Sequence, residues 1–216
     1  FIAVSLRRPD FPAYAFVYES LKRVATRSAG RTGPIWYFVP VLLAGSFPWI
    51  GPALAAAARA VRLRGGRRGP DGWPAVFVAS WALVPLIFFS LSQSKLPGYY
   101  LPALPGVALA AAMLLAHGLR DEGALRQAAR STTVVAVVMA ALGVATLVLA
   151  EVAFVQAPLS PQTRLRLPGV TLGLGTALAL GGFVAFVGAR RRAVWVMAAG
   201  LALPVPAAPL VAGPFL

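Results

Sequence analysis

The chain has 216 residues, of which 59% are apolar and 12% are charged, about half the charged fraction of an ordinary soluble domain. Its net charge of +14 comes from basic residues that lie between apolar runs. This pattern favours membrane topology and lipid phosphates over nucleic acid, for which the chain has no recognition motif. The lack of cysteine excludes disulfide bonds and thiolate metal sites. Composition therefore predicts an integral membrane protein.

The beginning of the chain differs in pattern from the rest. Over residues 14–25, apolar side chains recur at helical spacing and charged side chains occupy the opposite side. Glu19 and Arg23 are one helical turn apart and can form an ion pair. The pattern predicts a basic amphipathic helix in the membrane interface, within a juxtamembrane segment of residues 1–34. Because the chain starts at Phe1 without the features of a signal peptide, we expect a fragment of a larger protein.

Six apolar runs follow, and none of them contains a charged residue. Each run is close to the ~20 residues that a helix needs to cross about 30 Å of hydrocarbon. The runs lack the two-residue alternation of barrel strands, so they predict an all-α bundle of about six transmembrane helices over residues 35–216. The predicted spans are residues 33–58, 73–93, 99–116, 131–150, 169–189 and 193–215.

The basic residues between these spans predict the orientation of the chain. Alternate loops hold eleven arginines, whereas the opposite loops hold Lys95, Arg164 and Arg166. Because positive residues prefer the cytoplasmic side, the arginine loops are predicted to be cytoplasmic and the Lys95 loop external. The N-terminal segment is then external too, and its basic residues break the rule, which makes them candidates for function. The eleven arginines are Arg59, Arg62, Arg64, Arg67, Arg68, Arg120, Arg126, Arg130, Arg190, Arg191 and Arg192.

The segment Ser94-Lys95-Leu96-Pro97 places a charge between two membrane-length runs. Lys95 has two interpretations. It can be a lysine that snorkels from a helix end to the headgroups, or an ammonium that binds a phosphate at the outer surface. The nearby prolines fix an irregular turn and Gly98 allows close backbone approach, which favours phosphate binding.

Arg7 and Arg8 lie in the external segment, next to a proline and outside any regular helix pattern. Either they face lipid headgroups, or they join Lys95 around the same phosphate. The scarce carboxylates form no spaced acid/base pair of the kind that a hydrolase needs, and a single histidine makes no metal site.

Two stretches resemble one family of membrane enzymes. Residues 88–105 contain a phenylalanine pair, then Ser-Lys-Leu-Pro, an aromatic residue, and Leu-Pro with a further proline. Residues 8–23 contain Arg-Pro-Asp-Phe with later Glu19 and Arg23, and residues 33–49 contain an aromatic and proline-rich run. The combination resembles the lipid-dependent glycosyltransferases of the aminoarabinose transferase and protein mannosyltransferase superfamily.

The resemblance implies transfer of a sugar from a polyprenyl-phosphate donor at the external face of the bacterial inner membrane. The acceptor would be a lipid A-type or protein hydroxyl, and the other partners would be membrane lipids. The family is longer than this chain, so the chain would be its C-terminal half. The catalytic acid would then lie upstream of Phe1, in a first external loop.

The resemblance also implies roles for residues of this chain. Lys95 would hold the donor phosphate, helped by Arg7 or Arg8. The site would be further lined by Glu19, Arg23, Ser94 and Tyr99. The full-length enzyme could use a divalent metal, although Ser20 stands where aminoarabinose transferases tend to have a histidine, which argues against a metal contact at Glu19.

Another class of function stays open from the residues alone. A polytopic transporter or lipid-carrier subunit would also have proline-broken helices. The charge-free spans argue against ion coupling, which usually needs ionisable residues inside the membrane. A simple membrane anchor would not need the proline-framed Lys95 loop.

Overall fold

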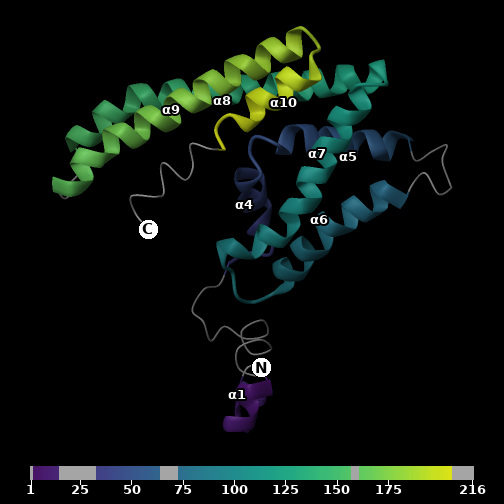
Figure 1. The fold of residues 1–216 in the computed structure, drawn as a ribbon, viewed down its shortest axis with the longest axis vertical. Helices are drawn as coiled ribbons and strands as arrows, with labels where there is room; N and C mark the ends of the chain where they lie inside the picture. The colour runs from purple at the N-terminus through teal and green to yellow at the C-terminus, as the bar shows by residue number, and fades with distance from the viewer. Residues whose placement is uncertain (1, 15–32, 64–72, 157–160, 206–216) are drawn as a thin grey trace. The chain divides into compact units, whose positions relative to one another are not determined.

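The computed structural model describes residues 2–14, 33–63, 73–156 and 161–205. As predicted, the regular structure in these ranges is helical (Figure 1). The chain divides into two compact units, residues 1–47 with 67–108 and residues 48–66 with 109–216. The helix α7 (Leu104–Gly118) begins in unit 1 and ends in unit 2.

Unit 1 contains α1 (Ile2–Arg7), α2 (Phe11–Ala13), α4 (Phe38–Gly45), α6 (Trp73–Leu91), and the 3-10 helix η4 (Pro97–Ala103). After α6 the chain runs irregularly over residues 92–96, and η4 then leads directly into α7. The predicted irregular turn is therefore present. A close approach follows it: a Cβ on Gly106 would lie 2.6 Å from the backbone nitrogen of Ala82, so only glycine lets α7 start this close to α6.

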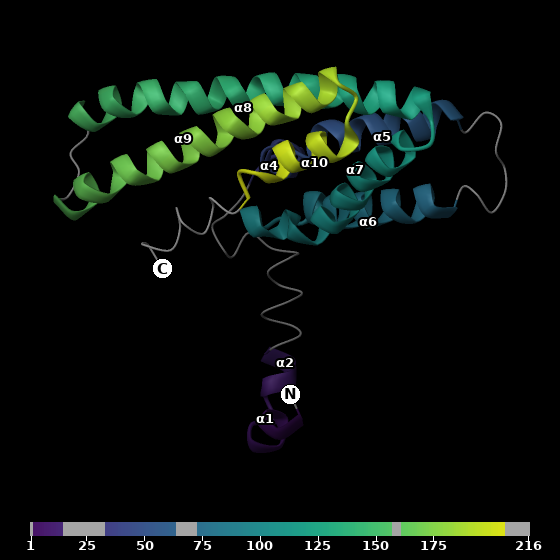
Figure 2. The same ribbon diagram turned by 45° about the horizontal axis from the view of Figure 1, so that its top comes forward.

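Unit 2 contains α5 (Ile50–Leu63), the end of α7, α8 (Glu122–Gln156), α9 (Pro161–Arg190) and α10 (Val194–Ala202). The helices α8 and α9 lie side by side with α10 against α9 (Figures 1 and 2). Residues near 182 meet residues near 138, and residues near 175 meet residues near 145, so α8 and α9 are antiparallel. A cluster of buried side chains joins the end of α7, the start of α8, the end of α9 and the start of α10: Leu114, Leu115, Ala124, Ala128, Ala129, Ala189, Val194 and Met197.

Small residues hold the unit 2 helices together. A Cβ on Gly182 of α9 would lie 2.6 Å from the carbonyl oxygen of Ala136 in α8, and one on Gly143 would lie 2.6 Å from the carbonyl oxygen of Gly175. Gly200 of α10 packs in the same way on the backbone of Ala185. In a membrane the hydrophobic effect does not drive helices together, so close backbone packing of this kind stabilises their association.

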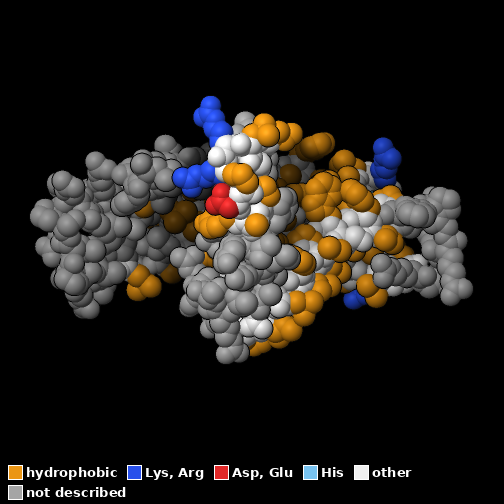
Figure 3. Space-filling view, turned by 90° about the horizontal axis from the view of Figure 1, so that it is seen from below, with side chains coloured by type: hydrophobic (Ala, Val, Ile, Leu, Met, Phe, Trp, Pro, Cys, Tyr) orange, Lys and Arg blue, Asp and Glu red, His pale blue; other side chains and the backbone are white. Residues whose placement is uncertain are grey.

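Large apolar side chains lie on the outside of the helices, as expected for a lipid-facing surface. Phe183 is 63% exposed and Trp195 is 75% exposed. Figure 3 shows hydrophobic side chains over much of the described surface, with Lys and Arg side chains at separate places. In the described ranges, four helices are long and apolar enough to cross a membrane, or five if α4 and α5 form one broken span.

The first and the last predicted spans differ most from the described helices. The predicted span 33–58 is interrupted by a turn at residues 46–49, where Pro48 removes a backbone donor and disfavours helix in the residue before it. The last predicted span, 193–215, contains α10, but residues 206–215 lie outside the described part of the chain. The predicted amphipathic helix also lies largely outside it, so the division at residue 34 stays a prediction.

Candidate functional site

Lys95 is buried between α6 and η4, with 6% of its surface exposed. Its Nζ donates hydrogen bonds to the carbonyl oxygens of Ser90, at 2.6 Å, and Phe89, at 3.2 Å. Both carbonyls belong to the last turn of α6, where they lack a helical partner and carry the negative end of the helix dipole. Lys95 therefore caps α6 and does not snorkel into water.

One aromatic ring lies beside the ammonium, and two further rings pack next to that ring. Nζ lies 5.4 Å from the centroid of Phe38, whose side chain is fully buried, so the ring face stabilises the cation. Phe89 lies 6.4 Å from Phe38, and Tyr99 stacks on Phe89 at 4.7 Å with an angle of 28°. The three rings thus come from α4, α6 and η4, and they build an apolar wall beside one positive charge.

The aliphatic stem of Lys95 packs closely against Gly33. A Cβ on Gly33 would lie 3.1 Å from Cγ of Lys95, so a larger residue at position 33 would press on the stem. Together with the two carbonyls and the ring of Phe38, this contact fixes the place of Nζ in unit 1.

Two serines shape the turn that carries Lys95. The backbone N–H of Ser94 donates to Oγ of Ser92, and the hydroxyl of Ser92 donates to the carbonyl of Ser94, both at 3.3 Å. The hydroxyl of Ser94 is buried, with 3% of the residue exposed, and finds no hydrogen-bond partner among the described residues. An unpaired buried hydroxyl costs about 1–3 kcal/mol, so Ser94 is a candidate ligand contact.

The electrostatics of the turn favour an anion. Burial lowers the pKa of Lys95 from its ordinary value of 10.5. An ammonium has three N–H donors, and the two carbonyls of α6 use two of them. One charged donor therefore remains for a ligand. A phosphate oxygen bound to the third N–H would favour the charged form of Lys95, which burial disfavours.

Four other predicted site residues, Arg7, Arg8, Glu19 and Arg23, belong to the N-terminal segment. Arg7 ends α1 and Arg8 follows it, both exposed. Residues 15–32 lie outside the described ranges, so the meeting of these arginines with Lys95 stays a prediction. Glu19 and Arg23 fall in the same gap. No three His, Cys, Asp or Glu side chains gather in the described part of the chain, so the described residues offer no metal ligand set.

Sequence reasoning missed the neighbours that fix Lys95. Phe38 and Gly33 were noticed only as members of an aromatic and proline-rich run. The carbonyls of α6 have no sequence signal, because every residue carries one. The position of a lysine a few residues beyond a helix end was the available indication, since such lysines often bind the last free carbonyls.

Known proteins related to this chain are named for one lipid phosphate. An undecaprenyl phosphate-alpha-4-amino-4-deoxy-L-arabinose arabinosyl transferase of Erwinia tasmaniensis is 37% identical over 161 residues, which are 73% of this chain and 28% of the relative. Its namesake in Yersinia enterocolitica is 41% identical over 108 residues, 50% of this chain and 19% of the relative. No protein-family model matches the chain.

A solved structure agrees with these relatives. The crystal structure of ArnT from Cupriavidus metallidurans, bound to undecaprenyl phosphate, matches 96% of this chain with a TM-score of 0.63 and 27% identity. The chain belongs to the aminoarabinose transferase superfamily. It spans 36% of the length of that ArnT chain, so it corresponds to one part of a transferase. The predicted family, the helical membrane fold and the multi-pass placement in the bacterial inner membrane are confirmed.

Proposed function

We propose that this chain is part of a membrane glycosyltransferase that moves a sugar from a polyprenyl-phosphate donor to a lipid A-type or protein hydroxyl. The observation that carries the proposal is Lys95, a buried ammonium with one N–H left for a ligand, in a chain related to transferases named for undecaprenyl phosphate. The proposed role of Lys95 is to hold the donor phosphate.

The chemistry that Lys95 would assist is a displacement at the sugar. The bond between the anomeric carbon and the phosphate oxygen breaks, and the polyprenyl phosphate leaves with the electron pair. An acceptor oxygen forms the new bond, and its proton passes to a general base, which we place upstream of Phe1. Negative charge grows on the departing phosphate, and a fixed cation in a dry site stabilises it.

We propose that the Lys95 turn faces the external side, together with residues 1–34. Two ion pairs in unit 2 support this orientation. Arg59 binds Asp121 at 3.0 Å and Arg192 binds Glu122 at 3.4 Å. They join three helix ends that belong to the arginine loops, as expected if these loops share the cytoplasmic side. Arg7 and Arg8 would then lie on the side of Lys95 and could add charge around the phosphate.

A transfer assay tests the function. The full-length protein, reconstituted in liposomes with a polyprenyl-phosphate sugar carrying a radiolabel, is expected to move the label to lipid A or to a peptide hydroxyl. Thin-layer chromatography and peptide gels separate the two products. Label that crosses the bilayer while still attached to the polyprenyl phosphate would instead identify a lipid carrier and overturn the proposal.

Ser94 offers a more local prediction. Ser94→Ala removes a buried hydroxyl that has no partner in the described structure, so the thermal unfolding temperature is expected to stay level or rise slightly. If the hydroxyl binds the donor, its loss raises the KM for donor about two- to twelvefold, the equivalent of one neutral hydrogen bond. An unchanged KM would remove Ser94 from the site. Ser80→Ala in the middle of α6 is the matched control, with no expected change in KM.

A further inference from the structure

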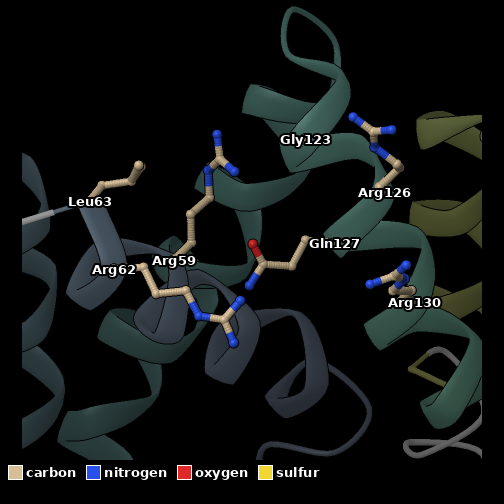
Figure 4. A pocket seen from close by; sticks show the side chains of 7 residues that line it. All are labelled: Arg59, Arg62, Leu63, Gly123, Arg126, Gln127 and Arg130. Atoms are coloured by element: carbon tan, nitrogen blue, oxygen red, sulfur yellow. The ribbon is translucent and has the colours of Figure 1, made fainter.

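The ends of α5 and α8 enclose a second candidate site, in unit 2. It is a pocket of about 560 Å³. In Figure 4 the arginine side chains reach into it from the two helices, with Gln127 between them. Gln127 also donates a 2.7 Å hydrogen bond to the carbonyl of Ala55, which ties α8 to α5. The pocket is lined by Arg59, Arg62, Leu63, Gly123, Arg126, Gln127 and Arg130, so no lining residue is acidic.

Most of the positive charge in this arginine pocket is uncompensated. Arg59 is paired with Asp121, and Asp121 also accepts the backbone N–H of Ala124 at the start of α8. Within the described residues, Arg62, Arg126 and Arg130 have neither an ion pair nor a hydrogen bond from their guanidinium groups. Three guanidinium groups are therefore available to an anion.

The pocket lies at the depth of lipid headgroups. On α5 the arginines follow directly after the charge-free residues 50–58, and on α8 they come just before the charge-free residues 131–150. At 1.5 Å per residue, every arginine of the pocket lies within about 8 Å of the apolar stretch of its own helix. Phosphate groups of a bilayer occupy this level, and the guanidinium fork matches their oxygen atoms.

An apolar path leads away from the charge. Val134 and Val138 lie one and two helical turns beyond Arg130 on the same face of α8, and both are exposed. Leu63 adds an apolar edge to the pocket itself. A free phosphate would use only the guanidinium groups, whereas a phospholipid would also cover this path with its acyl chains.

We propose that the arginine pocket binds a phosphate group, and that this phosphate belongs to the headgroup of an anionic phospholipid in the surrounding leaflet. Basic pockets between membrane helices recognise anionic headgroups in this way. The pocket volume lies in the range of about 300–1,000 Å³ that suits small ligands and headgroups. This proposal does not rest on the role proposed above for Lys95 in sugar transfer.

Native mass spectrometry of the purified protein, titrated with phosphatidylglycerol, tests the proposal. The double variant Arg62→Ala/Arg130→Ala is expected to bind this lipid roughly 25-fold more weakly than wild type, about fivefold for each arginine at the membrane surface. The matched control is Arg120→Ala/Arg191→Ala, which removes the same charge at exposed residues outside the pocket and should bind as wild type does.

Further arms identify the source of the phosphate and guard against misfolding. Phosphatidylcholine and inorganic phosphate should each bind at least tenfold more weakly than phosphatidylglycerol. Inorganic phosphate that binds as tightly as the lipid, or an equal loss in the control variant, would overturn the proposal. If the double variant does not fold, Arg126→Ala alone provides the comparison, with a roughly fivefold loss expected and an unchanged affinity counting against the site.

Discussion

If the full-length protein has the proposed activity, replacing Lys95 by methionine is expected to lower kcat/KM for sugar transfer roughly 100- to 1,000-fold, as for the loss of one charge-stabilising donor. Methionine keeps an unbranched stem against Gly33 and Phe38 but removes the ammonium. The loss of the cap on α6 should destabilise the protein by only about 0.3–2 kcal/mol, which melting curves can measure separately. Wild-type turnover in this variant would exclude Lys95 from the site.

Lys95→Arg tests whether transfer activity follows the titration of the Lys95 ammonium. Phosphate binding needs the charged amine, which is present below the pKa of Lys95 and is lost as the pH rises through it. Because burial lowers this pKa, wild-type transfer should fall in the alkaline range, beginning below pH 10.5. Arginine stays charged to above about pH 12, so partial activity that no longer falls in this range is expected. An identical alkaline fall in both proteins would assign it to another group. Arg191→Met, an exposed charge loss elsewhere, should leave the profile unchanged.

A leucine at Gly182 is expected to have the largest effect on folding. Its Cβ would lie 2.6 Å from the carbonyl oxygen of Ala136 and 2.7 Å from the backbone nitrogen of Ala140. These are backbone atoms and cannot turn aside, so α8 and α9 must separate. Overpacking of this kind costs about 1–3 kcal/mol or more, which should lower the unfolding temperature in detergent by several degrees.

Gly173→Leu is the matched control on the same helix. A Cβ at Gly173 meets no described atom within 4 Å, and leucine favours a helix more than glycine does. The control should therefore unfold at the wild-type temperature or slightly above it. If both variants lost stability equally, glycine content rather than helix contact would be the cause.

Hydropathy predicted the apolar parts of the helices, but not where the helices end. The predicted span 131–150 lies inside the longer α8 (Glu122–Gln156), because polar residues such as Gln127 and Arg130 extend a helix without extending its apolar stretch. The turn at residues 46–49 was also missed. Pro48 was visible in the sequence, but an apolar average does not register the loss of a backbone donor.

The sequence predicted Lys95 as a site residue but did not predict the side chains that pack around it. Lys95 stood out because a charge between two apolar runs is unusual. Its burial under Phe38 could not be foreseen, since Phe38 lies in α4, far away along the chain. The unpaired hydroxyl of Ser94 was equally invisible, because burial of a serine depends on the path of the backbone around it.

The discontinuous make-up of unit 1 has a consequence for biosynthesis. Phe38 reaches Lys95 only after residues 48–66, which belong to unit 2, have been synthesised between them. The contacts of α8 with α9 and of α9 with α10 join neighbours along the chain, and closing short loops is faster than closing long ones. We therefore expect the helical hairpin of α8 and α9 to assemble soon after it leaves the ribosome. The contact between Phe38 and Lys95 is expected to form later, because these two residues are far apart in the sequence.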